Sequence, residues 1–153
     1  MFSESLQEGG YGEHAIWNLY VNMKGVRSVV DVRKDREFQE KDIDFLVEDI
    51  NRQFTSIEVK TDFKAHETGN LVYELSTSNN VGCFDKTQAK YIVYFIPKAK
   101  EAHVISVKAL RDYVYNKAHP EEKKMGDNAT GFLLPIAELK KHGVIEKTFE
   151  GVM

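Results

Sequence analysis

The feature that most constrains this chain is the run Tyr-Ile-Val-Tyr-Phe-Ile at 91–96, which Pro97 closes. A short uninterrupted apolar run is typical of a strand buried on both faces, because an exposed face would bring polar residues at every second position. Such a strand needs a sheet with further layers packed on both sides. The run is far too short to span a membrane. We therefore expect an α/β domain built on a central sheet.

The composition fits one globular domain and limits what the protein can bind. The chain has 153 residues, of which 42% are hydrophobic and 29% charged, enough for one sizeable core. Its 21 Lys and Arg residues are outnumbered by 24 Asp and Glu residues, so the net charge is −3. A nucleic-acid function would thus need a local basic surface or bound cations. Because Cys83 is the single cysteine and the first ten residues lack a secretory pattern, we expect a cytoplasmic protein.

Hydrophobic periodicity and turn residues predict the order of the elements. We expect loops at 33–40, 62–70 and 119–130, and we expect the last of these to be mobile. The segment 71–75 is apolar, but its pattern does not define its type of secondary structure. The expected elements are helices at 12–24, 85–90 and 107–116, strands at 26–32, 42–47, 54–61, 91–96 and 103–107, and a short helix opened by Pro135 and ended by Gly143. This order predicts one domain over 1–153 with a mixed sheet, a core at about 12–107 and a C-terminal extension at 108–153.

Charged residues lie on two of the expected strands. Glu58 and Lys60 share one face of the 54–61 strand, about 7 Å apart, while Ile57 and Val59 point the other way. If the 42–47 strand pairs with this one, Asp44 can approach Glu58. Two carboxylates held close together repel each other, and a divalent cation with hard oxygen ligands, such as Mg²⁺, relieves that repulsion. Lys60 beside the metal could hold or deprotonate a water and stabilise a phosphate in its transition state.

Asp44 followed by Ile57-Glu58-Val59-Lys60, after a helix that carries Glu13, resembles the PD-(D/E)xK nuclease superfamily. The resemblance implies a restriction-endonuclease-like αβββαβ core over roughly residues 12–107. It also implies Mg²⁺, or Mn²⁺ in its place, held by Asp44, Glu58, the Val59 carbonyl and Glu13, with Lys60 as the catalytic lysine. The proline that precedes the aspartate in the family is replaced by Ile43.

Some of these assignments have alternatives. Asp42 would share the face of Asp44 and is the alternative ligand. Glu13 near the start of a helix could instead favour the helix dipole. Glu74 is a secondary candidate without assigned chemistry, in a segment that looks like small phage-type members of the superfamily. A phage-encoded protein would act in the host cytoplasm.

Three polar residues precede the apolar run, where a DNA-facing helix would lie: Lys86, Gln88 and Lys90. Each could equally belong to a solvated helix face. The five histidines show no zinc-ligand spacing. We therefore expect a metal-dependent endonuclease that hydrolyses phosphodiester bonds in DNA, with branched DNA among the candidate substrates and a homodimer as a plausible assembly. One alternative is a catalytically silent nuclease-fold protein that binds nucleic acid or a protein partner. Another is a structural α/β protein in which Glu58 and Lys60 form a surface ion pair.

Overall fold

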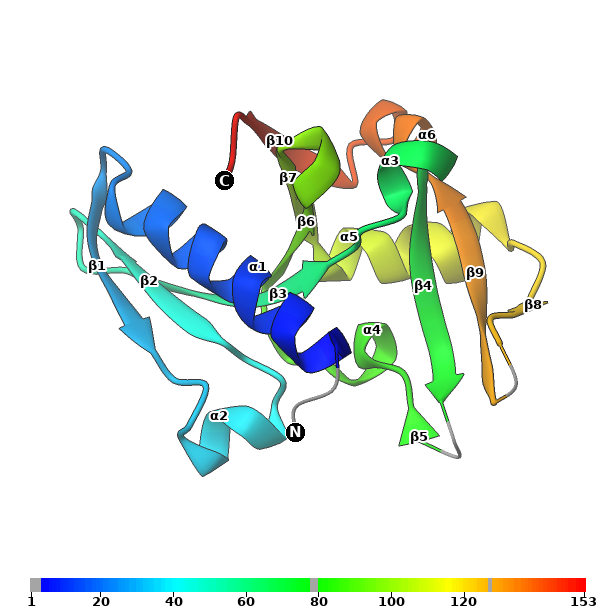
Figure 1. Cartoon of the computed structure of the whole chain (residues 1–153), viewed down its shortest axis with the longest axis horizontal. Coiled ribbons are helices and arrows are strands. Elements are labelled where there is room, and N and C mark those ends of the chain that lie inside the picture. The colour runs from blue at the N-terminus through cyan, green and yellow to red at the C-terminus, as the bar shows by residue number, and fades with distance from the viewer. Residues whose placement is uncertain (1–3, 78–79, 127) are drawn as a thin grey trace.

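A six-stranded mixed sheet forms the centre of the molecule, as the computed structural model shows for residues 4–77, 80–126 and 128–153 (Figure 1). The sheet is flanked by helices, which confirms the predicted α/β class. Strands β3 and β6 are parallel, and the other neighbouring pairs are antiparallel. In sheet order the strands are β1 (Val26–Asp31), β2 (Phe45–Asp49), β3 (Phe54–Thr61), β6 (Tyr91–Ile96), β7 (Glu101–Ser106) and β10 (Ile145–Glu150).

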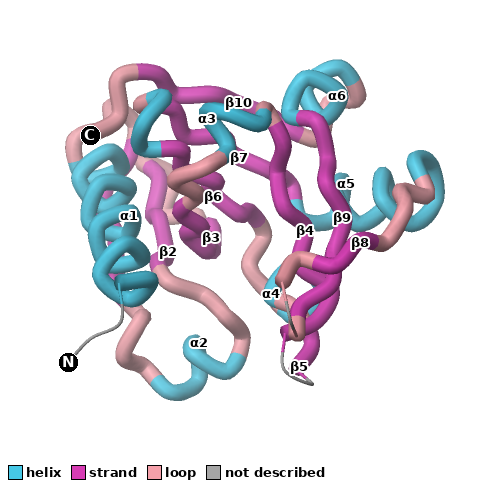
Figure 2. Tube along the Cα trace, turned by 45° about the vertical axis from the view of Figure 1, so that its right-hand side comes forward, coloured by secondary structure: helices cyan, strands magenta, loops and turns pink. Residues whose placement is uncertain are grey.

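Helix α1 (Glu4–Val21) lies along one face of this sheet (Figure 2). Ile16 of the helix is fully buried against Phe45 and Ile57 of the sheet. The helix comes closest to β3 at Gly12, where a Cβ would lie 1.6 Å from the Thr61 Oγ1. Its start at Glu4 is earlier than predicted, because glycine lowers helix propensity without forbidding a helix that packing stabilises.

A second sheet, which the sequence did not predict, covers part of the opposite face. It consists of β5 (Asn80–Val81), β4 (Asn70–Thr77), β9 (Ala129–Pro135) and β8 (Lys123–Lys124), in that order. The main core lies between the sheets, where Ile92 and Tyr94 of β6 pack in one cluster with Tyr73 and Phe132. The segment 119–130, expected to be a loop, contains β8 and the start of β9. The C-terminal part of the chain therefore contributes strands to both sheets.

The connection from β3 to β6 also differs from the prediction. It runs through α3 (Ala65–Thr68), β4, β5 and the one-turn helix α4 (Cys83–Lys86). The helix expected at 85–90 ends at Lys86, because Thr87 has an extended backbone with φ −58° and ψ 140°.

The remaining elements complete the layers. Helix α2 (Arg36–Glu40) replaces an expected turn and is capped by the Asp35 side chain. The others are a 3₁₀ turn (Pro97–Ala99), α5 (Val107–Asp112), which continues as a π-helix (Tyr113–Ala118), and α6 (Ile136–Lys141). Within the described part of the chain, no helix has the length and apolar character needed to cross a membrane.

Candidate active site

Asp44 lies directly before β2 and is fixed by hydrogen bonds to its neighbours. The register that pairs Phe45 with Ile57 brings Asp44 beside Glu58. The Asp44 amide donates to the Ile57 carbonyl at 2.9 Å, and the Asp44 Oδ2 accepts from the Val59 amide at 2.7 Å. Because the N–H and C=O of one strand residue point to the same edge, the Val59 carbonyl also faces this side.

The environment of Asp44 raises its pKa to about 6. Burial is the largest cause, since it disfavours the charged carboxylate. The hydrogen bond from Val59 acts in the opposite direction, and the nearby charge of Glu13 raises the pKa further. Asp44 is therefore ionised at neutral pH and protonated in mild acid.

Glu58 is the most unusual residue of the site. It is only 6% exposed, and its Oε2 is buried without a hydrogen-bond partner among the described residues. Its Oε1 lies 3.9 Å from the Lys60 Nζ. Burial raises the pKa of Glu58 to about 7, the Lys60 charge and hydrogen bonding from the Thr87 side chain oppose this, and the charges of Asp44 and Asp42 add to it. A buried carboxylate oxygen without a donor is energetically costly, which makes it a position where a cation would stabilise the site.

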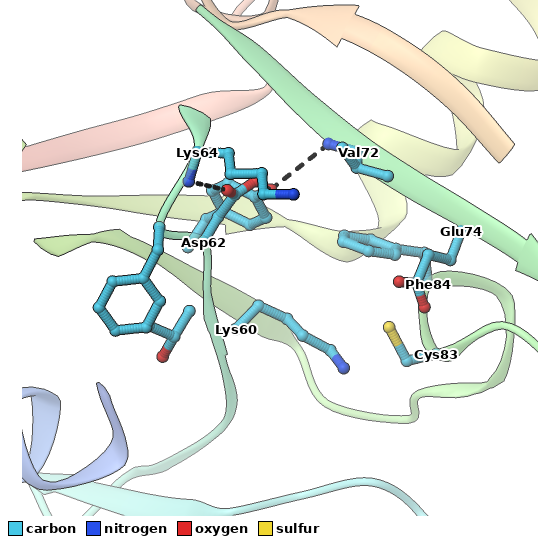
Figure 3. A pocket seen from close by; sticks show the side chains of 10 residues that line it. Lys60, Asp62, Lys64, Val72, Glu74, Cys83 and Phe84 are labelled. Carbon is cyan, nitrogen blue, oxygen red and sulfur yellow. Dashed lines mark hydrogen bonds between the residues drawn. The ribbon is translucent and has the colours of Figure 1, made fainter. Parts of the chain in front are cut away.

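Lys60 extends from β3 into a cavity of about 320 Å³. Figure 3 shows its ammonium group pointing toward Cys83 of α4 and Glu74 of β4. Burial favours the neutral amine, but the pKa of Lys60 is raised, because Cys83 in its thiolate form, Glu58 and Glu74 all favour the ammonium; with a neutral thiol, the two carboxylates remain as its partners. Burial also raises the pKa of Cys83 to about 11, so its thiol stays protonated at neutral pH. Glu74, a secondary candidate in the sequence, thus lies near the site.

Glu13 contacts a residue that the sequence analysis missed. Its Oε2 accepts a hydrogen bond at 2.9 Å from the Nη1 of Arg33, whose guanidinium also binds Asp31. Across the described segments, no group of three His, Cys, Asp or Glu side chains is placed to hold a metal ion together. The structure therefore brings Asp44 and Glu58 together and leaves Glu13 paired with an arginine.

Asp42, the alternative ligand, does not belong to β2. Its backbone has a positive φ of 56°, which places it in a turn before the strand. Its carboxylate lies 3.8 Å from the Lys86 Nζ. The expectation that Asp42 shares a strand face with Asp44 is therefore wrong, because the left-handed backbone of Asp42 places it in the turn, although its charge still acts on Glu58 and raises the pKa of that residue.

The three expected DNA-binding residues do not share a helix face. Lys86 ends α4, whereas Gln88 and Lys90 lie in the segment that leads into β6. The side chains of all three are exposed. The Lys90 amide donates to the Ser56 Oγ at 2.9 Å, and its Nζ lies 5.5 Å from the centre of the Tyr91 ring. The prediction of a helix at 85–90 is wrong, and these residues instead form part of a surface beside the start of β6.

Comparison with solved structures identifies a bacterial homing endonuclease of similar fold. The match has a TM-score of 0.50 and 18% sequence identity, and it covers 69% of this chain and 71% of the other. Searches of protein-family models and of curated proteins gave no match. The protein therefore has a mixed α/β fold that is also found in an endonuclease.

Proposed function

We propose that this protein is a divalent-metal-dependent DNA endonuclease of the PD-(D/E)xK type, with Asp44 and Glu58 as its metal ligands. The observation that carries the proposal is the buried, unpartnered Glu58 Oε2 beside Asp44. Natural proteins rarely leave a buried carboxylate oxygen without a donor or a cation. The likeness of the fold to that of a homing endonuclease points to the same class of reaction.

The residues present fit a hard cation. Asp44, Glu58 and the Val59 carbonyl offer only oxygen, the ligand type that Mg²⁺ and Mn²⁺ prefer. Mg²⁺ usually keeps several waters and needs only one or two protein carboxylates. Two carboxylates and a carbonyl therefore suffice without Glu13. The raised pKa values of Asp44 and Glu58 mean that cation binding competes with protons below about pH 7.

Lys60 is suited to act as a hydrogen-bond donor. Its raised pKa keeps it an ammonium at neutral pH, so it can orient the attacking water and stabilise negative charge on the phosphate. A bound cation would supply Lewis-acid stabilisation of that phosphate. Lys60 cannot take a proton from the attacking water, since it is already protonated, and we assign that role to none of the other side chains of the site.

DNA is the proposed substrate, and the net charge of −3 means that its binding relies on local positive charge. Lys86, Gln88 and Lys90 are candidate contacts to the DNA backbone. A homodimer would supply the two sites needed to cut both strands of a duplex.

A second candidate function is a catalytically silent nuclease-fold protein that binds nucleic acid. The observation that favours it is the pairing of Glu13 with Arg33, since among the described residues no three carboxylates are then placed together around one cation. A silent protein would bind DNA equally well with or without a divalent cation.

The experiment that tests the proposal is incubation with duplex, single-stranded and branched DNA in Mg²⁺, Mn²⁺ or EDTA. We expect cleavage with either metal, none in EDTA, and none with Glu58→Gln. Glu48→Gln serves as the matched control, because Glu48 lies on β2 and accepts from the Ser28 Oγ at 2.8 Å, outside the site. DNA binding without cleavage under all conditions would favour the silent protein.

A further inference from the structure

Arg33 links helix α1 to the end of β1 through a three-way charge cluster. Its Nε and Nη2 donate to the two Asp31 carboxylate oxygens at 2.9 and 2.7 Å. Its Nη1 donates to the Glu13 Oε2 at 2.9 Å. A guanidinium bound to one carboxylate by two bonds and to a second by one is held in a defined orientation, because its donors form a rigid planar fork.

The cluster lies near Asp44, whose pKa is raised by the charge of Glu13 and lowered by that of Arg33. The Arg33 Cζ is 5.3 Å from the centre of the Phe45 ring, and Phe45 is the buried residue that follows Asp44. The Val32 amide, one residue before Arg33, donates to the Asp44 carbonyl at 3.0 Å. Arg33 is thus connected to Asp44 in two ways: its guanidinium packs on the ring of the next residue, Phe45, and the residue before it, Val32, is hydrogen-bonded to the Asp44 backbone.

Helix α1 cannot bring Glu13 closer by moving as a whole. At Gly12, the neighbouring residue, the helix is already so close to β3 that a Cβ would overlap the Thr61 side chain. Ala15 and Ile16 are buried on the same sheet. Only a rotation of the Glu13 side chain can therefore redirect its carboxylate, and this requires breaking its bond to Arg33.

We propose that Arg33 is a positioning residue that holds Glu13 outside the metal site, so that the cation and Arg33 compete for the Glu13 carboxylate. This inference rests on the proposed function. It explains why no three acidic side chains are placed together for a metal in the described residues, although Glu13 lies near Asp44. It also predicts that the site binds a cation weakly until Arg33 releases Glu13.

The test is calorimetric titration of Mn²⁺ into the DNA-free protein at pH 8, where Asp44 and Glu58 are ionised. The variants are Arg33→Lys, Arg33→Gln, Glu13→Gln and the double variant Arg33→Lys/Glu13→Gln, each checked for folding by its melting temperature. Arg33→Lys keeps the charge but lacks the fork that binds two carboxylates. Lys34→Gln is the control for the loss of a neighbouring positive charge.

We expect Arg33→Lys and Arg33→Gln to tighten Mn²⁺ binding about tenfold, because the cation no longer has to displace the charge-assisted hydrogen bond between Arg33 and Glu13. Lys34→Gln should change the affinity by less than about twofold, because an exposed charge is screened. Glu13→Gln should have little effect alone but should abolish the gain in the Arg33→Lys background. Two results would overturn this inference but not the proposed function. One is that Glu13→Gln weakens Mn²⁺ binding equally in the wild type and in Arg33→Lys, and the other is that neither Arg33 variant binds Mn²⁺ more tightly than the wild type. Absence of Mn²⁺ binding in the wild type and in every variant would overturn the proposed function as well.

Discussion

The two faces of β3 are buried to a similar extent but have opposite chemistry. On the face toward α1, Ile57 is 2% exposed and packs with Phe45 and Ile16. On the other face, Glu58 is 6% exposed and has an unpartnered oxygen. Burial stabilises the fold on the first face and costs free energy on the second. One strand thus combines a stabilising core face with a site whose burial is costly, so substitutions on its two faces should have separable effects on stability and on activity.

The largest expected effect on stability comes from the core face. Ile57→Ala should lower the free energy of unfolding by about 2–5 kcal/mol, because it removes buried methyl groups and leaves a cavity. The cleavage rate per folded molecule should stay nearly unchanged, since the Ile57 carbonyl that binds the Asp44 amide is retained. Urea denaturation and a cleavage assay measure the two quantities. A loss below about 1 kcal/mol would show that this face is not a packed core.

Lys60→Ala should have the opposite effect to Ile57→Ala, because it should lower cleavage and leave the fold intact. Cleavage should fall about 10²- to 10³-fold, because the water and the developing phosphate charge lose their donor. Metal binding and folding should persist. Lys98→Ala, which changes an exposed lysine of the 3₁₀ turn, is the control and should cleave like the wild type. Cleavage by Lys60→Ala at the wild-type rate in saturating Mg²⁺ would refute the role given to this lysine.

The next largest effect is expected in the pH dependence of the free energy of unfolding, which should report on Glu58 and so on the polar face of β3. The pKa of Glu58 rises from 4.5 to about 7 on folding, so the folded state binds more protons between these values. The free energy of unfolding should therefore decrease as pH rises through this window. In Glu58→Gln this contribution, on the order of 3 kcal/mol, should be absent. Urea denaturation in EDTA at pH 5 and pH 8 tests this, and equal pH dependence in both proteins would contradict the burial of a titrating Glu58.

A smaller effect is expected from metal binding. A cation that binds only the folded state at one hundred times its Kd raises the free energy of unfolding by about 2.7 kcal/mol. With Mn²⁺ this gain should be larger at pH 8 than at pH 5, because protons compete for Asp44 and Glu58. Thermal unfolding with and without Mn²⁺ measures it. Asp44→Asn should reduce the gain, whereas an equal gain in wild type and variant would place the metal elsewhere.

The sequence predicted those parts of the fold that local patterns define. The bounds of β3 and β6 follow from an alternating pattern and from a continuous apolar run. The pairing of β2 with β3, which brings Asp44 near Glu58, follows from their succession along the chain. These two strands and their charged residues determine the candidate site.

The second sheet could not be predicted in this way. In it, Tyr73 of β4 pairs with Phe132 of β9, two residues far apart in the chain. The apolar pattern at 71–75 was visible, but its partner strand was not. Arg33 was missed for the same reason, since only tertiary packing brings α1 and the end of β1 together and so lets it bind Glu13.

The metal site at Asp44 and Glu58 is tested most directly by soaking a crystal of the protein in Mn²⁺ at pH 8 and measuring its anomalous scattering. We expect a peak within metal-ligand distance of the Asp44 carboxylate, the Glu58 Oε2 and the Val59 carbonyl. The same soak of Glu58→Gln should show no peak there. A peak elsewhere, or no peak beside Asp44 and Glu58 in the wild type, would contradict the assignment of this face of β3 as a metal-dependent active site.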